Sequence, residues 1–238
     1  MAEGNSIMIK FSDFEKKIKV VFKDKKLLEQ SFTHRSFINE NPGADLAHNE
    51  RLEFLGDAVL ELIVTDFLYK KYLGYTEGEL TALRSALVNA IIISEVAGDI
   101  GMNDYLLLSK GEAKDFGKAR QYILANTYEA LIGAMYLDQG YETVDKFVIK
   151  TLLPKTEEIV NKKLWRDAKS LVQERAQEYA LVTPAYKVLH ETGPDHDKHF
   201  TVGIYFAKDL IAEGKGKSKQ EAEQSAALAA LKVKNWLD

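Results

Sequence analysis

The stretch HNERLEFLGDAVLEL, residues 48–62, places four acidic side chains inside a segment that otherwise consists mostly of apolar residues. Carboxylates rarely enter such a segment without a partner. Asn49 is a residue type that caps helix N-termini, and Gly74 is a typical helix stop. Because the segment between them is apolar almost all round, we predict a buried central helix over residues 49–72. The fold must accommodate a core helix that carries several acids.

The acids of this helix lie along one side. At about 100° per residue, Glu50, Glu53 and Asp57 fall within about 60° of one another, and Glu61 is close to the same line. Like charges at this spacing repel each other. The helix dipole favours Glu50 and Glu53 in the first turn, but it does not explain Asp57 in the third. Two explanations remain open, a bound divalent cation, which we favour, and a solvated acidic edge.

A second polar pair lies in ILANTYEALIGA, where Asn126 and Glu129 are three residues apart on another apolar segment. If the two helices cross face to face, Glu53 and Asp57 would join this pair in one oxygen-rich site. Mg²⁺ suits a site of that chemistry, and such a site can hydrolyse a phosphodiester. Spacing alone does not show that the helices meet.

The first 160 or so residues are predicted to be mostly helical. Ser12 and Glu15 form a potential capping box at the start of the first helix, and Pro154 interrupts the last. We expect helices over residues 12–22, 49–72, 76–101, 122–140 and 145–165, with a polar loop at 109–121.

In the last 70 or so residues the hydrophobic pattern changes from the helical period to the alternation that is typical of strands. Phe200, Val202, Ile204 and Phe206 alternate as in a half-buried strand, with a hairpin turn expected at Lys208-Asp209. Ser218 and Glu221 form a second potential capping box. The predicted order is a helix at 167–181, antiparallel strands at 184–193, 199–207 and 210–217, and a helix at 218–237.

Composition supports two units with different roles. Residues 165–238 contain 11 basic and 11 acidic side chains, so the preceding residues carry the whole net charge of −4. The chain has no cysteine, which excludes disulfides and thiolate metal sites and favours an intracellular location. Residues 1–14 lack the apolar run of a signal peptide, and no stretch approaches the roughly 20 apolar residues of a membrane span. We expect a cytoplasmic protein with no membrane partner.

Five blocks of the sequence resemble ribonuclease III in the right order, namely FTHRSF, HNERLEFLGDAVL, LTALRSALV, LSKGE and ILANTYEALIGAMYLDQG. The last segment is similar to a double-stranded-RNA-binding domain, and the resemblance covers residues 10–236. It implies a two-domain protein with an all-α nuclease domain (8–155), a linker (156–165) and an α-β-β-β-α RNA-binding domain (166–236). It also implies a homodimeric, Mg²⁺-dependent endonuclease, with Mn²⁺ as a substitute, that leaves 5′ phosphates, 3′ hydroxyls and short 3′ overhangs on double-stranded RNA.

The resemblance also assigns roles to single residues. It implies metal binding by Glu53, Asp57, Asn126 and Glu129, and catalytic roles for Asp57, Glu129 and Glu50. Glu79 corresponds to an acid near RNA. Phe54 corresponds to an aromatic knob that enters a socket on the second subunit. On the residues alone ordinary core is the simpler interpretation of Phe54, but with the resemblance we favour the dimer role. RNA contacts fall on Gln173, Glu174, His196, Lys217 and Lys219. His34 and Arg35 are expected to be internal hydrogen-bond partners.

Two positions depart from the family pattern. Gln220 replaces a basic residue, which should weaken phosphate anchoring. Asn126 replaces an aspartate, and its amide can bind a cation but cannot act as a base. This asparagine is interpreted as a tolerated variant, as an inactivating substitution, or as the mark of a weak enzyme. The chain is accordingly expected to process RNA as a nuclease. The alternative is a double-stranded-RNA-binding protein with impaired catalysis, and a remote third reading is a phosphohydrolase of small nucleotides.

Overall fold

The structure is a computed structural model that describes residues 10–161, 168–194 and 198–236. The chain divides into two compact units, Met1–Lys163 and Leu164–Asp238, which are described separately. The expected linker over 156–165 overlaps a helix, α9 (Lys155–Asn161), which belongs to the first unit.

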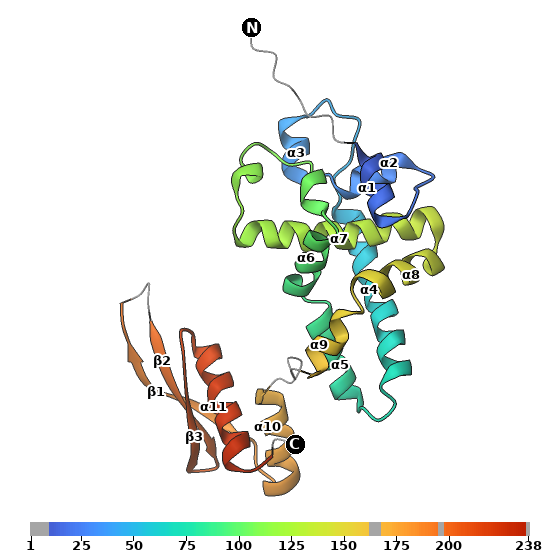
Figure 1. Cartoon of the computed structure of the whole chain (residues 1–238). Coiled ribbons are helices and arrows are strands. Elements are labelled where there is room, and N and C mark those ends of the chain that lie inside the picture. Colours follow the sequence, from blue (N-terminus) through green and yellow to red (C-terminus); the bar gives the residue numbers. More distant parts are fainter. Residues whose placement is uncertain (1–9, 162–167, 195–197, 237–238) are drawn as a thin grey trace. The chain divides into compact units, whose positions relative to one another are not determined.

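The first unit is helical, as predicted. Its two longest helices, α4 and α7, lie across each other at the centre, and the shorter helices surround them (Figure 1). Their mutual face supplies much of the core. The elements are α1 (Phe11–Ile18), α2 (Lys25–Ser31), α3 (Arg35–Glu40), α4 (Glu50–Lys71), α5 (Glu77–Leu87), α6 (Ala90–Asp99), the 3₁₀ turns η1 (Met102–Tyr105) and η2 (Glu112–Lys114), α7 (Lys118–Gln139), α8 (Tyr141–Thr151) and α9.

The single long helix expected over residues 76–101 is wrong. The chain bends by 47° between α5 and α6. Asn89 adopts an extended conformation there, and its Oδ1 accepts hydrogen bonds from the backbone N–H groups of Ile91 and Ile92, both at 3.0 Å. The asparagine therefore starts a new helix instead of continuing the old one.

Within the described ranges, no single helix is long and apolar enough to cross a membrane, and α5 and α6 meet such a test only when they are taken together as a bent pair.

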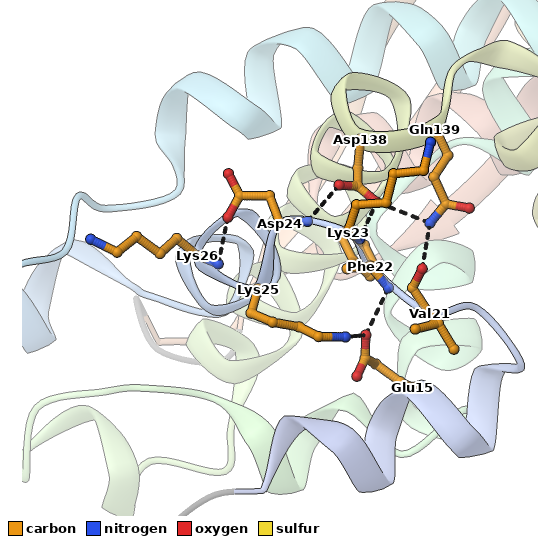
Figure 2. Close-up of polar contacts among 9 residues, drawn as sticks. All are labelled: Glu15, Val21, Phe22, Lys23, Asp24, Lys25, Lys26, Asp138 and Gln139. Carbon is orange, nitrogen blue, oxygen red and sulfur yellow. Dashed lines mark hydrogen bonds and ion pairs between the residues drawn. The ribbon is translucent and has the colours of Figure 1, made fainter.

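The expected Ser12–Glu15 capping box is also wrong, because α1 begins one residue earlier, at Phe11, and has no side-chain cap. Glu15 is instead buried, with 5% of its surface exposed. Its carboxylate accepts hydrogen bonds from the backbone N–H of Phe22 at 2.7 Å and from the Lys25 ammonium at 2.5 Å (Figure 2). This acid holds the segment that follows α1 in place.

Asp138 ties the C-terminal end of α7 to the segment before α2. Its two carboxylate oxygens accept the backbone N–H groups of Lys23 and Asp24, each at 2.8 Å, and Gln139 donates to the carbonyl of Val21 at 2.9 Å (Figure 2). Burial opposes ionisation of Asp138, but the two backbone amides, the Gln139 amide and the Lys23 charge together outweigh it and hold its pKa below the usual range.

We expect Asp138→Ala to lower the free energy of unfolding by about 1–2 kcal/mol at pH 7, because two backbone donors lose a charged acceptor. The loss should shrink as the pH falls through the lowered pKa, where the wild-type carboxylate is protonated. Urea unfolding at pH 7 and at pH 3 measures both effects. Asp13→Ala, which breaks an exposed ion pair with Lys16, is the control and should cost less than about 0.5 kcal/mol. Equal losses in the two variants would contradict the assignment.

The second unit has the predicted helix–three strands–helix order. Its elements are α10 (Ala168–Ala180), β1 (Ala185–Thr192), β2 (His199–Phe206), β3 (Asp209–Gly216) and α11 (Lys219–Val233). The sheet is antiparallel in the order β1-β2-β3.

The predicted alternation on β2 is confirmed, since Phe200, Val202, Ile204 and Phe206 are all buried. The hairpin turn is one residue earlier than expected. Phe206 pairs with Asp209, which leaves Ala207 and Lys208 in the turn. On β3, a Cβ at Gly214 would overlap the backbone of α11. This close approach explains why α11 is rich in alanine.

Candidate active site and RNA-binding surface

Two glycines bring α4 and α7 into backbone contact where the helices cross. A Cβ on Gly56 would overlap the carbonyl oxygen of Glu129, and a Cβ on Gly133 would overlap the carbonyl oxygen of Leu52. A residue with no side chain is therefore required on both helices. The same helical turns carry the acids singled out in the sequence, so this contact brings the two polar sets together.

The crossing gathers the four residues predicted to form one site. Asn126 hydrogen-bonds the carboxylate of Glu53, and Glu129 lies within electrostatic range of both Glu53 and Asp57. Glu53 and Glu129 are half-buried, whereas Asp57 and Asn126 are exposed. The site is thus an oxygen-rich cluster that opens to solvent on one side.

The electrostatics of the cluster are those of crowded, partly buried carboxylates. Burial, followed by the charges of Asp57 and Glu53, raises the pKa of Glu129 from 4.5 to about 8. Burial, followed by Glu50 and Asp57, also raises the pKa of Glu53, against the hydrogen bond from Asn126. All of the charged neighbours that influence these two groups are acids.

The donor set fits a hard divalent cation. Three carboxylates and one amide supply only oxygen ligands, and a cation would relieve the repulsion that raises both pKa values. In the part of the chain that the structure describes, no group of three His, Cys, Asp or Glu side chains is arranged to hold a metal ion. The chemistry of these four side chains therefore suits a metal ion, but their oxygens do not converge on a single point.

Glu50 stands at the exposed edge of this cluster. Its carboxylate lies 3.3 Å from Nη1 of Arg35 and 3.7 Å from Nδ1 of His48. His34 is an internal hydrogen-bond partner, as expected, because its Nδ1 lies 2.8 Å from the hydroxyl of Ser36 and caps α3. Arg35 differs from the expectation, since its side chain is mostly exposed and faces Glu50. Sequence spacing gave no signal for the Arg35 and His48 contacts.

Phe54 does not belong to the core of this unit, because 83% of its surface is exposed. The same side of α4 leads to a pocket of about 490 Å³ between α4 and α5. The pocket is lined by Thr65, Leu68, Tyr69, Tyr75, Glu77, Leu80, Thr81 and Arg84. Glu79 lies in the first turn of α5, where its carboxylate accepts the N–H and the hydroxyl of Thr76 in a capping box.

The second unit presents most of the residues expected to contact RNA. Gln173 and Glu174 are exposed on α10, and Lys217 and Lys219 are exposed where α11 begins. His196 lies outside the described residues.

The expected capping box at the start of α11 is half formed. Ser218 accepts the N–H of Glu221 at 3.1 Å, but the Glu221 carboxylate accepts the N–H of Lys217 at 2.7 Å instead of that of Ser218. Two exposed lysines thus lie at the N-terminus of α11, where the helix dipole favours phosphate.

Fold and site together define a helical nuclease with a crowded acid centre, followed by a module that binds duplex RNA. The family model described as Ribonuclease-III-like matches residues 24–156, and the Double-stranded RNA binding motif matches residues 168–234. The chain belongs to the ribonuclease III family, and it is a double-stranded-RNA endonuclease of that type.

Individual relatives match nearly the whole chain. Ribonuclease 3 of Bdellovibrio bacteriovorus is 42% identical over 92% of this chain and 94% of its own length. Ribonuclease 3 of Protochlamydia amoebophila is 45% identical over 91% of this chain and 89% of its own. A solved structure of the nuclease domain of ribonuclease III from Campylobacter jejuni matches 61% of this chain and 97% of its own length, with 36% identity and a TM-score of 0.56. It is described as flexible in a region involved in dimer formation.

Proposed function

We propose that this endonuclease hydrolyses phosphodiester bonds of duplex RNA with Mg²⁺, or with Mn²⁺ in its place, and acts in RNA processing in the cytoplasm. Its products would carry 5′ phosphates and 3′ hydroxyls with short 3′ overhangs. The observation that carries the proposal is the gathering of three acids and an amide at the crossing of α4 and α7, where burial and crowding raise the pKa of two of the acids. Glu53, Asp57, Asn126 and Glu129 would hold the cation, which when bound lowers the pKa of water and neutralises charge on the phosphate.

The residues of the chain itself have separable tasks in this proposal. The Asn126 amide orients the carboxylate of Glu53. Glu129 sets the charge at the half-buried end of the site and Asp57 at its open side. Glu50, beside Arg35, would orient the RNA strand at the rim. Gln173 and Glu174 on α10, with Lys217 and Lys219 on α11, would grip the duplex by its shape and its phosphates.

The proposal includes a homodimer in which each copy cuts one strand. Phe54 is a large, exposed apolar side chain, and the pocket between α4 and α5 is a recess of matching chemistry. Knob and recess lie on the same face of α4. A two-fold dimer needs this arrangement, because the same patch must serve both copies. The Phe54 ring of each copy would fill the pocket of the other.

Incubation with a long RNA duplex and Mg²⁺ tests the proposal directly. We expect cleavage to short duplexes in the presence of Mg²⁺ and none with a chelator. Binding without cleavage at any Mg²⁺ concentration would instead support the second candidate function, a double-stranded-RNA-binding protein with impaired catalysis. The observation that favours this alternative is the amide at Asn126.

Asn126→Asp should lower the Mg²⁺ concentration that gives half-maximal cleavage by about threefold to tenfold, because it adds a fourth carboxylate to the site. A Mg²⁺ titration of initial cleavage rates measures the shift. Gln220→Lys is the control, since it adds to the basic residues of the RNA-binding unit and should change RNA affinity without changing the Mg²⁺ requirement. An Asn126→Asp titration that superimposes on wild type would contradict the prediction.

A further inference from the structure

The exposed side of α4 forms one continuous, largely apolar face. Phe54, Ala58, Leu62, Thr65 and Tyr69 are all exposed, and on a helix they fall within about 80° of one another. We call these five residues the α4 face. Its C-terminal end forms part of the pocket, which Thr65 and Tyr69 help to line. The knob and its proposed socket are thus the two ends of one surface.

Two-fold symmetry fixes the centre of this face. If the symmetry operation carries Phe54 of one copy into the pocket of the other, the midpoint between Phe54 and the pocket lies on the axis. The α4 residues of the pocket are 65, 68 and 69, so that midpoint falls near residue 61. Glu61, at the edge of the α4 face, therefore lies at the level of the symmetry axis.

Glu61 is an acid without a counter-charge. It is half-buried, and it makes no hydrogen bond or ion pair within residues 10–161, 168–194 and 198–236. It is also the one acid among residues 58–65. A second copy laid on the α4 face would remove water from this carboxylate, which costs free energy unless a cation replaces the water.

Arg84 is a cation in the complementary situation. It is half-buried beside the pocket, and its Nη1 donates to the hydroxyl of Thr65 at 3.1 Å. Among the described residues it has no carboxylate partner. Thr65 lies one helical turn after Glu61 on the same side of α4. The two-fold operation places Thr65 of the second copy beside residue 57 of the first, one turn before Glu61. The Arg84 side chains of the two copies therefore flank the axis on both sides.

We propose that Glu61 of each copy pairs with Arg84 of the second copy across the two-fold axis. The inference rests on the proposed homodimer and deepens it. Two acids and two bases form an electrically neutral cluster at the centre of a largely apolar interface. The pairing satisfies four charges that would otherwise be buried alone, and it makes the contact selective for a second copy of this chain.

A charge swap tests the pairing. Glu61→Arg and Arg84→Glu should each weaken dimerisation by about tenfold to 100-fold, because each places like charges at the axis. The double variant, with both substitutions in one chain, should return the dissociation constant to within about tenfold of wild type. Sedimentation equilibrium of the full chain over a range of concentrations measures this. Asp104→Arg, an exposed charge reversal on η1 outside the α4 face, should leave dimerisation unchanged.

Further variants separate failure of the inference from failure of the dimer. Phe54→Ala should dissociate the dimer whether or not Glu61 and Arg84 pair. If wild type dimerises and Phe54→Ala does not, but the charge-swapped double variant stays as weak as the singles, the pairing is overturned while the dimer stands. A tighter dimer in Glu61→Gln would also overturn it, because that result identifies two repelling acids at the axis. A wild-type chain that stays monomeric at every concentration overturns the dimer and the pairing together.

Discussion

Gly56→Ala should cost the nuclease unit about 3 kcal/mol or more of its free energy of unfolding, although it adds a single methyl group. The added carbon would overlap the carbonyl oxygen of Glu129 on α7. A flexible side chain could rotate away from such a contact, but helix backbone cannot, so α4 and α7 must move apart. Because the acids sit on the same turns, the variant should also lose cleavage activity even where it remains folded.

Thermal unfolding and a cleavage assay on the same samples measure both losses. Gly133→Ala should behave in the same way, because its methyl group would overlap the carbonyl of Leu52. Gly98→Ala is the matched control. It lies in helix α6 with no atom within 4 Å of the added carbon, and it should be neutral or stabilise by up to about 1 kcal/mol. A Gly56→Ala protein as stable and active as Gly98→Ala would show that the helices do not touch as described.

Glu129→Gln should reduce cleavage of duplex RNA by at least about 100-fold while leaving RNA binding unchanged. The substitution keeps the size of the side chain and removes one of three carboxylates from the proposed cation site. Binding should persist because the second unit carries the expected contacts with the duplex. Cleavage rates and RNA affinity measured on the same preparation separate the two effects. Continued cutting at the wild-type rate would refute the proposed site.

The same variant has a second readout that does not depend on activity. In a chelator, folding raises the pKa of Glu129 from 4.5 to about 8, so the folded state holds a proton that the unfolded state releases. The resulting stabilisation is complete below about pH 4.5 and is lost as the pH rises to about 8. Glu129→Gln should remove that part of the pH dependence. An unchanged slope of unfolding free energy between pH 5 and pH 8 would contradict this assignment.

Helical spacing was enough to predict which polar side chains share one side of each helix. Offsets of three and four residues placed Glu53 with Asp57 and Asn126 with Glu129, and the structure brings these pairs together. Alternation likewise predicted β2 and its buried face. These features depend on local periodicity, which can be read directly from the sequence.

Features that depend on contacts between distant segments were missed. The sequence shows Gly56 and Gly133, but nothing in their spacing says that each faces a carbonyl of the other helix. Glu15 is a local capping residue by pattern and a buried anchor in three dimensions. Asn89 did carry a usable signal, because an asparagine ahead of an apolar run is a common helix start, but the long run of helix-forming residues around it outweighed that signal.

The glycine contact between α4 and α7 separates the frame of the site from its chemistry. Since backbone atoms set the distance between the two helices, the spacing of the donor positions does not depend on which donors occupy them. Asn126 illustrates this freedom, because an amide shares the crossing with three carboxylates while the helices stay in contact. Substitution of single side chains can therefore change metal preference and turnover without moving the two helices. The two positions that do not tolerate such substitutions are Gly56 and Gly133, which take no part in the reaction.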